Sequence, residues 1–240
     1  MTDTLTGSIH RPADLSVGQR ARMADLLYQF FENVTPAQFN ADLDEKEWVF
    51  VFRDGAGTIW GFSTLARMDL AVDDCPVTAV FSGDTIIHPD YWHELELPKI
   101  WGAHVFALAD QVHAEKPAAK VYWFLISSGY KTYRFLPVFF NDFYPTYRQP
   151  TPPAIQRTLD ALATRRFGDQ YDPATGIVRF REASPLRPGV AEVDESRLRN
   201  KDIAFFVARN PGYVDAHQLA CLVEIDRTNI TAAGRRMLGI

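Results

Sequence analysis

The chain has 240 residues, 47% of them hydrophobic, which is enough to bury one large core. Its formal net charge of -5 argues against nucleic acid or an anionic membrane surface as a partner. The two cysteines, Cys75 and Cys221, lie far apart and form neither a disulfide scaffold nor a CxxC zinc motif, so we expect a reduced, cytoplasmic protein without a metal centre. No segment is apolar over the length of a membrane span, and residues 1–15 lack the core of a signal peptide.

The first part of the chain predicts two helices and a hairpin. Apolar residues recur at helical spacing over residues 17–34, and Ser16 is suited to cap that helix. A short second helix is expected from Pro36, because proline favours the first helical position. The apolar period then changes, and residues 47–68 read as two strands joined by the turn DGAG.

The middle of the chain alternates strands with helices. We expect a strand over residues 78–87, a helix over 97–113 and a strand over 118–128. The last of these is almost continuously apolar, which indicates burial on both faces. A further helix is expected over 132–144. The order of elements predicts the α/β class, with a mixed sheet flanked by helices.

The stretch RQPTPP, residues 148–153, is the strongest interruption in the chain. It divides an α/β domain over residues 1–150 from a C-terminal extension over residues 151–240. The extension predicts a helix over 154–167, irregular structure with short apolar elements, and a closing helix capped by Thr228. Its apolar content is too low for an obvious core of its own, so we expect it to pack on the first domain.

Two short motifs lie within this order of elements. The return strand of the hairpin begins with Gly61 and Phe62, and the strand over 78–87 leads into HPDY, residues 88–91. With these motifs the chain resembles the GNAT superfamily of N-acyltransferases, from about residue 15 to residue 147. The resemblance implies two parallel strands that separate at their carboxyl ends, a small-molecule amine substrate and an acyl-CoA donor.

The loop after HPDY departs from the family pattern. Family members carry an arginine or glutamine followed by glycines, whose backbone and helix start hold a diphosphate. Here residues 92–99 read WHELELPK, without a glycine, and Glu94 and Glu96 would repel a diphosphate. No cofactor is therefore certain: an acyl-CoA bound by a variant loop and a thioester on a carrier protein are both open.

Polar residues follow the apolar parts of the two expected parallel strands. Carboxyl ends of strands are where open α/β sheets bind ligands. We take Asp84 as the first catalytic candidate, because a carboxylate there can hold an ammonium group or act as a base. The structural alternative is an aspartate that caps the next turn. The substrate-binding candidates at these strand ends are Ser82, Thr85, Ser127 and Ser128.

Further candidates follow each strand. His104 lies on the apolar stripe of its helix, as either a hydrogen-bonded core residue or a catalytic imidazole that faces the same site. The resemblance implies a tyrosine that protonates the leaving thiolate, and Tyr130 or Tyr133 could fill that role. Lys131 and Arg134 could bind a carboxylate, phosphate or sulfate of the substrate, or lie on a solvated face.

Three functions stay open on the sequence. The first is a GNAT-like enzyme acting on an amine or amino-acid-like substrate, with acyl transfer from a CoA or carrier-protein thioester. The second is a CoA-independent enzyme of natural-product biosynthesis, in which an amine displaces a sulfate or phosphate within the same molecule to close a strained nitrogen ring. The third is a non-catalytic partner subunit whose extension is an interaction surface.

Overall fold

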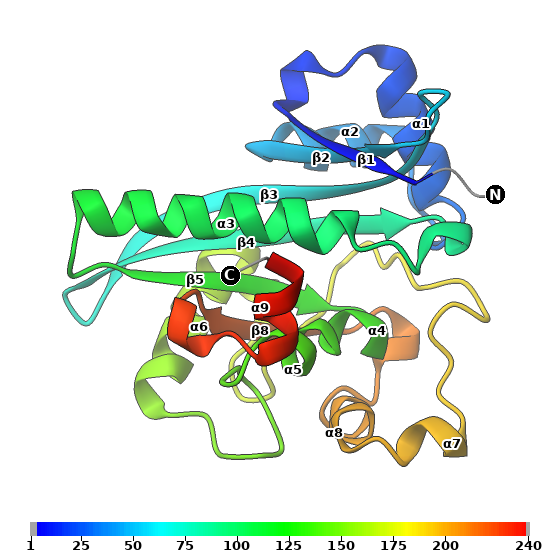
Figure 1. Cartoon of the computed structure of the whole chain (residues 1–240). Helices are drawn as coiled ribbons and strands as arrows, with labels where there is room; N and C mark the ends of the chain where they lie inside the picture. The colour runs from blue at the N-terminus through cyan, green and yellow to red at the C-terminus, as the bar shows by residue number, and fades with distance from the viewer. Residues whose placement is uncertain (1–3, 239–240) are drawn as a thin grey trace.

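The computed structural model describes residues 4–238 and shows one mixed sheet of eight strands (Figure 1). The strand order is β1-β2-β3-β4-β5-β8-β7-β6, and only β4 and β5 run parallel. The strands are β1 (Thr6–His10), β2 (Trp48–Arg53), β3 (Ile59–Val72), β4 (Cys75–Ile87), β5 (Lys120–Ser127), β6 (Tyr171–Asp172), β7 (Ile177–Val178) and β8 (Gln218–Glu224). The expected mixed α/β sheet is confirmed. The expectation for the chain start falls partly on residues 1–3, outside the described residues.

Helices cover both faces of this sheet, and in Figure 1 α3 lies across its front. The helices are α1 (Val17–Leu27), α2 (Pro36–Asp44), α3 (Glu96–Glu115), α4 (Tyr130–Tyr133), α5 (Phe135–Phe139), α6 (Pro153–Phe167), α7 (Glu195–Leu198), α8 (Lys201–Arg209) and α9 (Ala232–Leu238). None of the helices within residues 4–238 is both long and apolar enough to span a bilayer.

The two faces follow from the alternation of side chains along each strand. In β2, Phe50 and Phe52 point into the core below α3, whereas Val49 and Val51 point into the core below α1 and α2. Along β4, Phe81 joins the core below α6. The layer of α1, α2 and α6 therefore covers one face, and α3 covers the other.

The first two helices begin where the sequence predicts. The hydroxyl of Ser16 accepts a hydrogen bond from the backbone N–H of Gln19 at 3.2 Å, and the Gln19 side chain accepts one from the Ser16 N–H at 2.8 Å. Helix α2 begins at Pro36. The first helix ends at Leu27 rather than at residue 34, because the following residues turn so that Phe31 pairs with Leu186.

The expectations for the second half need three corrections. The single helix expected over 132–144 is two short ones, α4 and α5, and it begins earlier, at Tyr130. The closing helix begins at Ala232 and follows Thr231, whose hydroxyl accepts from the N–H of Gly234 at 3.1 Å; Thr228 caps nothing there. One of the short apolar elements of the extension is β8, a buried strand beside β5.

The extension adds to the sheet of the first part. Strands β8, β7 and β6 continue the sheet beyond β5, and α6 packs Leu159, Leu162 and Phe167 against Phe81 and Phe124. The division at residue 150 stays a prediction. The described part of the extension shares both a sheet and a core with the residues before it.

Candidate functional site

Strands β4 and β5 separate at their carboxyl ends. The last residues that pair are Ser82 and Leu125. Beyond them β4 continues beside β3 to Ile87, while β5 continues beside β8 to Ser127. The separation implied by the resemblance is therefore present, and Asp84 lies directly past the last pair.

A bulge in β4 sets the direction of Asp84. The pairing of β3 with β4 shifts between Ser63 and Leu65, so Gly83 and Asp84 together stand opposite Thr64. A Cβ on Gly83 would lie 2.6 Å from Cε of Lys46 and 2.6 Å from Oγ1 of Thr64. Glycine therefore leaves the space that the Lys46 side chain occupies, on the face covered by α2.

Lys46 is a buried cation beside Asp84. Its side chain is fully buried, its ammonium pairs with the carboxylate of Asp42, and it donates to the carbonyl of Asp42 at 2.9 Å. Arg166 from α6 approaches the same carboxylate at 3.6 Å and the carboxylate of Glu45 at 2.7 Å. A buried ammonium requires such partners, because an unpaired charge in the interior is costly.

The surroundings of Asp84 change its acidity. Burial raises the pKa of Asp84 to about 7, the negative charge of Asp42 adds to the rise, and Lys46 opposes it. No described residue donates a hydrogen bond to the Asp84 carboxylate, and the turn after β4 is capped by the His88 side chain instead. At neutral pH this carboxyl is divided between its acid and carboxylate forms, which suits it to accept and release a proton.

The polar candidates on β4 form hydrogen bonds within the sheet. Ser82 Oγ accepts from Nε1 of Trp123 at 2.9 Å, which ties β4 to β5 just before they separate. The hydroxyls of Thr85 and Ser63 lie 2.7 Å apart. These hydrogen bonds fix the side chains of Ser82 and Thr85 within the sheet, at the edge of the separation.

The two serines at the end of β5 differ in access. Ser127 is fully buried, and its hydroxyl has no partner among the described residues. It lies beside Cys221, whose thiol pKa burial raises to about 12. Ser128 is half-buried. Ser128 is therefore the more accessible of the two to a bound molecule.

His104 lies on the face of the sheet opposite Asp84. Its ring packs edge to face against Trp48 and Phe50, with centroids at 4.8 and 5.4 Å. Burial lowers the pKa of His104, and the positive charge of Arg11 lowers it further. Of the two alternatives for His104, its packing under β2 agrees with a core residue rather than with an imidazole that faces Asp84.

Two cations with aromatic partners lie at the ends of β4 and β5. The Lys131 ammonium stands 4.1 Å above the ring of Trp92, which links the residues that follow the two strands. Tyr130 is buried, and its hydroxyl accepts from the Arg197 guanidinium, which also lies 5.4 Å from the ring centre. Burial lowers the pKa of Lys131 and the charge of Arg197 lowers it further, so the two cations are close neighbours.

These two cations differ in their acidic partners. Arg197 has a carboxylate of Asp194 at 3.9 Å, whereas no acid within residues 4–238 forms an ion pair with Lys131. Positive charge held on aromatic rings without a close acid is able to bind an anionic group.

Two of the sequence candidates lie outside this arrangement. Tyr133 is fully buried, its hydroxyl donates to the carbonyl of Pro145 at 2.8 Å, and burial raises its pKa. Arg134 is exposed and forms no ion pair with a described residue. We assign neither of them a part in the site.

Sequence reasoning missed Lys46, Arg166 and Arg197. Lys46 follows Asp42 by four residues, a spacing typical of an ion pair on a helix surface, so nothing marks it as buried. Arg166 and Arg197 come from α6 and α7, far along the chain from β4. Only the tertiary structure brings them near the strand ends.

The start of α3 does not fit the diphosphate of CoA. Leu95 precedes the helix without a side-chain cap, and Pro98 has no N–H to offer. Glu96 stays in the first turn, where its Oε1 accepts from the N–H of Gly7 at 3.1 Å. A carboxylate held at this point occupies the positive end of the helix and repels a diphosphate. No group of three or more His, Cys, Asp and Glu side chains that could hold a metal ion occurs in the described part of the chain.

No protein-family model matches the sequence, and no curated protein does. The structure is similar to a conserved protein of unknown function from Enterococcus faecalis, with a TM-score of 0.41 and 15% identity over 54% of this chain and 31% of that one. It is similar to the GNAT family N-acetyltransferase YhbS from Escherichia coli, solved with CoA, at a TM-score of 0.36 and 16% identity over 56% of this chain and 69% of that one. For glucosamine-6-phosphate N-acetyltransferase from Arabidopsis thaliana the TM-score is 0.32, with 16% identity over 50% and 81% of the two chains.

The present chain thus spans about a third of the length of the Enterococcus faecalis protein. Its own strand order, the parallel β4–β5 pair and the separation of that pair make its fold GNAT-like.

Proposed function

We propose that this chain is a small-molecule enzyme that transfers an acyl group from a thioester to an amine or amino-acid-like substrate. The observation that carries the proposal is the separation of β4 from β5, with Asp84 directly past the last pair. Lys131 and Arg197 supply positive charge beside the same strand ends. A candidate proton acceptor, Asp84, and two candidate anion-binding groups, Lys131 and Arg197, therefore lie beside the point where β4 and β5 separate.

The reaction assigns a proton to each group. Asp84 takes one proton from the substrate ammonium, and the free amine attacks the thioester carbonyl. The new carbon–nitrogen bond forms, and the carbon–sulfur bond breaks. Tyr130 gives its hydroxyl proton to the departing thiolate and receives the proton that the nitrogen loses. Asp84 then returns its proton to solvent. The products are an amide and a thiol.

The donor is a thioester on a carrier protein. Because the start of α3 does not fit a diphosphate, a phosphopantetheine arm with its single phosphate is the better match to Lys131 and Arg197. An aromatic ring below Lys131 keeps its ammonium extended from the chain without an acid to neutralise it.

A matched pair of donors tests this function. Thiol release is followed with acyl-phosphopantetheine and with acyl-pantetheine, over a panel of primary amines. We expect release to require an amine and to fall by about 100-fold or more in Asp84→Asn. Asp90→Asn removes an exposed acid from the next turn and serves as the control. Lys131→Ala should raise KM for the phosphorylated donor only.

Two results would contradict the assignment. Equal rates for Asp84→Asn and the parent protein would remove Asp84 from the reaction. A thermal titration with acetyl-CoA gives the second: stabilisation near the ~2.7 kcal/mol expected at 100 times Kd would show that CoA binds despite the loop.

The same geometry favours one further candidate. The poor fit to CoA, together with two neighbouring cations, suits an amine that displaces a sulfate or phosphate within its own molecule. The carbon–nitrogen bond forms as the carbon–oxygen bond breaks, Asp84 takes the amine proton, and the leaving anion meets Lys131 and Arg197. Release of inorganic sulfate from an amino sulfate ester, without any thioester, distinguishes this chemistry. No turnover in either assay, with Asp84→Asn harmless in a complex, would indicate a partner subunit.

A further inference from the structure

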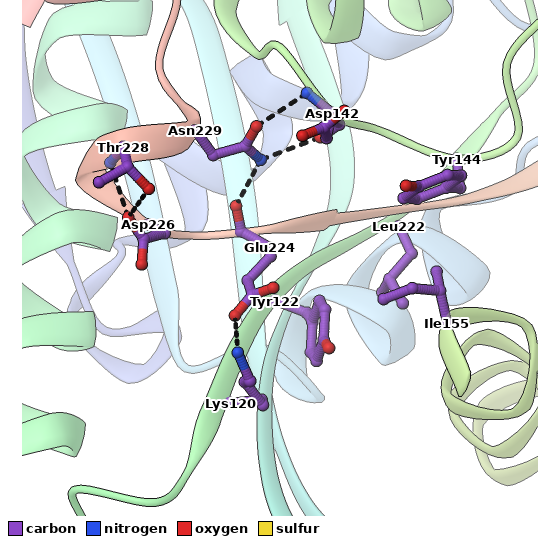
Figure 2. A pocket seen from close by; sticks show the side chains of 10 residues that line it. All are labelled: Lys120, Tyr122, Asp142, Tyr144, Ile155, Leu222, Glu224, Asp226, Thr228 and Asn229. Atoms are coloured by element: carbon purple, nitrogen blue, oxygen red, sulfur yellow. Dashed lines mark hydrogen bonds and ion pairs between the residues drawn. The ribbon is translucent and has the colours of Figure 1, made fainter. Parts of the chain in front are cut away.

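A cavity of about 330 Å³ lies at the other end of β5, away from the separation (Figure 2). Tyr122 in its wall lies five positions along the strand from Ser127, or about 17 Å. The cavity is formed by the start of β5, the end of β8, the loop before α6 and α6 itself. Its lining residues are Lys120, Tyr122, Asp142, Tyr144, Ile155, Leu222, Glu224, Asp226, Thr228 and Asn229.

The phenol of Tyr122 is the first sign of a ligand. The residue is only 5% exposed, yet its hydroxyl forms no hydrogen bond with any residue in the described range. Burial raises the pKa of Tyr122 to about 12, and the negative charge of Glu224 adds to the rise. Figure 2 shows its ring between Glu224 on one side and Ile155 on the other. A hydroxyl without a protein partner, on an otherwise buried residue that lines a cavity, leaves a hydrogen bond for a ligand to complete.

The acids of the cavity keep free acceptor oxygens. Glu224 uses Oε1 to accept from Lys120 at 2.5 Å, and its Oε2 has no partner among the described residues. Asp226 uses Oδ1 for the backbone N–H and hydroxyl of Thr228, both at 2.6 Å. Asp142 accepts on Oδ1 from Gln149 at 3.1 Å. Three acids against one lysine give the lining a formal charge of -2.

The rim that carries these acids is held in place. The Asn229 side chain donates to the carbonyls of Asp142 and Glu224 at 2.9 and 3.0 Å, and it accepts from the Asp142 N–H at 2.8 Å (Figure 2). Both the oxygen and the nitrogen of the Asn229 amide are therefore engaged in hydrogen bonds to the backbone. A preformed rim lowers the entropy lost when a ligand binds.

The remaining wall is apolar, and the acids are not arranged for a metal ion. Leu222, Ile155 and the Tyr144 ring line the side away from Lys120. None of the described acids comes together in a group of three that could hold a metal. A ligand that meets separated acceptors and an apolar wall is an extended organic cation rather than an ion.

We propose that this cavity binds a small alkyl amine or diamine, with its ammonium groups at Glu224 and Asp142 and its carbon chain against Leu222 and Ile155. The Tyr122 hydroxyl completes the contact as a hydrogen-bond acceptor for one N–H. The site is separate from the proposed reaction and does not depend on it.

Calorimetric titration of the full chain tests the site with three probes of similar length: 1,4-diaminobutane, 1-aminobutane and the uncharged 1,4-butanediol. We expect the diamine to bind more tightly than the monoamine and the diol not to bind. Glu224→Gln and Tyr122→Phe should each weaken diamine binding by about tenfold, the loss of one hydrogen bond to a charged group. Magnesium chloride at equal ionic strength should not compete.

Two control variants keep the result specific. Asp110→Asn removes an exposed acid that pairs with Arg227 at 2.7 Å outside the cavity, so it changes charge equally and should leave binding unchanged. Asp84→Asn should also leave it unchanged, which separates this site from substrate binding at the strand ends. If Asp110→Asn weakens diamine binding as much as Glu224→Gln does, the effect comes from net charge alone and the proposal is wrong. If Glu224→Gln binds the diamine as tightly as the parent protein, the proposal is likewise overturned. Both cavity variants carry conservative changes, and their unfolding curves verify that they fold.

Discussion

The two ends of the β4–β5 pair hold charge in different ways. At the carboxyl end the Lys46 side chain is fully buried, and burial raises the pKa of Asp84 to about 7. At the amino end the side chains of Lys120 and Glu224 are 52% and 31% exposed. Hydrogen bonds from Thr228 lower the pKa of Asp226 there. Buried charge is suited to proton transfer, whereas solvated charge is suited to holding a counter-charge.

The cavity and the carboxyl with the raised pKa lie at opposite ends of the β4–β5 pair. The cavity of about 330 Å³ lies at the amino end, where hydrogen bonds from Thr228 lower the pKa of Asp226. The carboxyl with raised pKa lies at the other end, beside the strand separation. The position of the cavity therefore does not point to the carboxyl whose pKa is raised.

Replacing the lysine at each end should give the largest contrast. Lys46→Met removes a buried ammonium beside Asp84 and leaves Asp42 with only Arg166, at 3.6 Å, as a counter-charge, so we expect a loss of about 3 kcal/mol in the free energy of unfolding. Lys120→Met breaks the solvated pair with Glu224 and should cost less than about 1 kcal/mol. Urea unfolding at neutral pH measures both. Equal losses would show that Lys46 is as well solvated as Lys120.

The two aspartates should give pH effects of opposite sign. The folded-state pKa of Asp84 lies above its ordinary 3.8, so the folded protein is disfavoured increasingly as pH rises toward about 7. Asp84→Asn should then stabilise the protein by about 1–3 kcal/mol at about pH 8, and by little at about pH 4. The pKa of Asp226 is lowered, so its carboxylate stabilises the fold above its ordinary pKa and the stabilisation is lost in acid.

Asp226→Asn should therefore destabilise the protein at neutral pH, by up to about 1 kcal/mol for a lost cap. Paired unfolding curves across pH measure both variants. If Asp84→Asn also lowers stability at high pH, the carboxylate form is favoured in the fold and the raised pKa is wrong.

The contrast also explains what sequence patterns could predict. Period and capping signals located the start of α1 at Ser16 and of α2 at Pro36, because these depend on neighbours within one turn. The strand order from the hairpin to β5, and Asp84 at its polar end, followed from local alternation and from the GNAT resemblance. The apolar run of β8 was recognised but not its place in the sheet, because its strand partners are β5, about 95 residues earlier, and β7.

The charged residues next to Asp84 and Tyr130 could not be predicted from local sequence patterns. Lys46 packs into space that a side chain at Gly83 would fill. Arg197 contacts Tyr130, which lies 67 residues earlier in the chain. For His104 the sequence left a core residue and a catalytic imidazole open, because helical spacing identifies the buried stripe and not the strand beneath it. Which residues meet in such contacts is decided by the tertiary structure.

A backbone change can disturb the buried end without removing a charge. Gly83→Ala places a Cβ 2.6 Å from Lys46 Cε and from Thr64 Oγ1, so the lysine must move. We expect a loss of about 1–2 kcal/mol in unfolding free energy and a shift in the pH dependence of activity. Gly57→Ala is the control for a glycine in open space, although its φ of 86° adds backbone strain there. A pH profile unchanged in Gly83→Ala would show that Lys46 does not influence Asp84.

The smallest effect is expected where a cation meets an exposed ring. The Trp92 side chain is exposed, with the residue 53% accessible, and it holds the Lys131 ammonium at 4.1 Å while its own N–H donates to the Ile87 carbonyl at 2.8 Å. Trp92→Phe keeps an aromatic face and loses the N–H, whereas Trp92→Ala loses both. If the ring positions Lys131 for an anionic donor, Trp92→Ala should raise KM for the phosphorylated donor by about twofold to fivefold and Trp92→Phe by less. Equal KM values in both variants would assign the effect to the N–H bond, and no change in either would leave Lys131 to act without the ring.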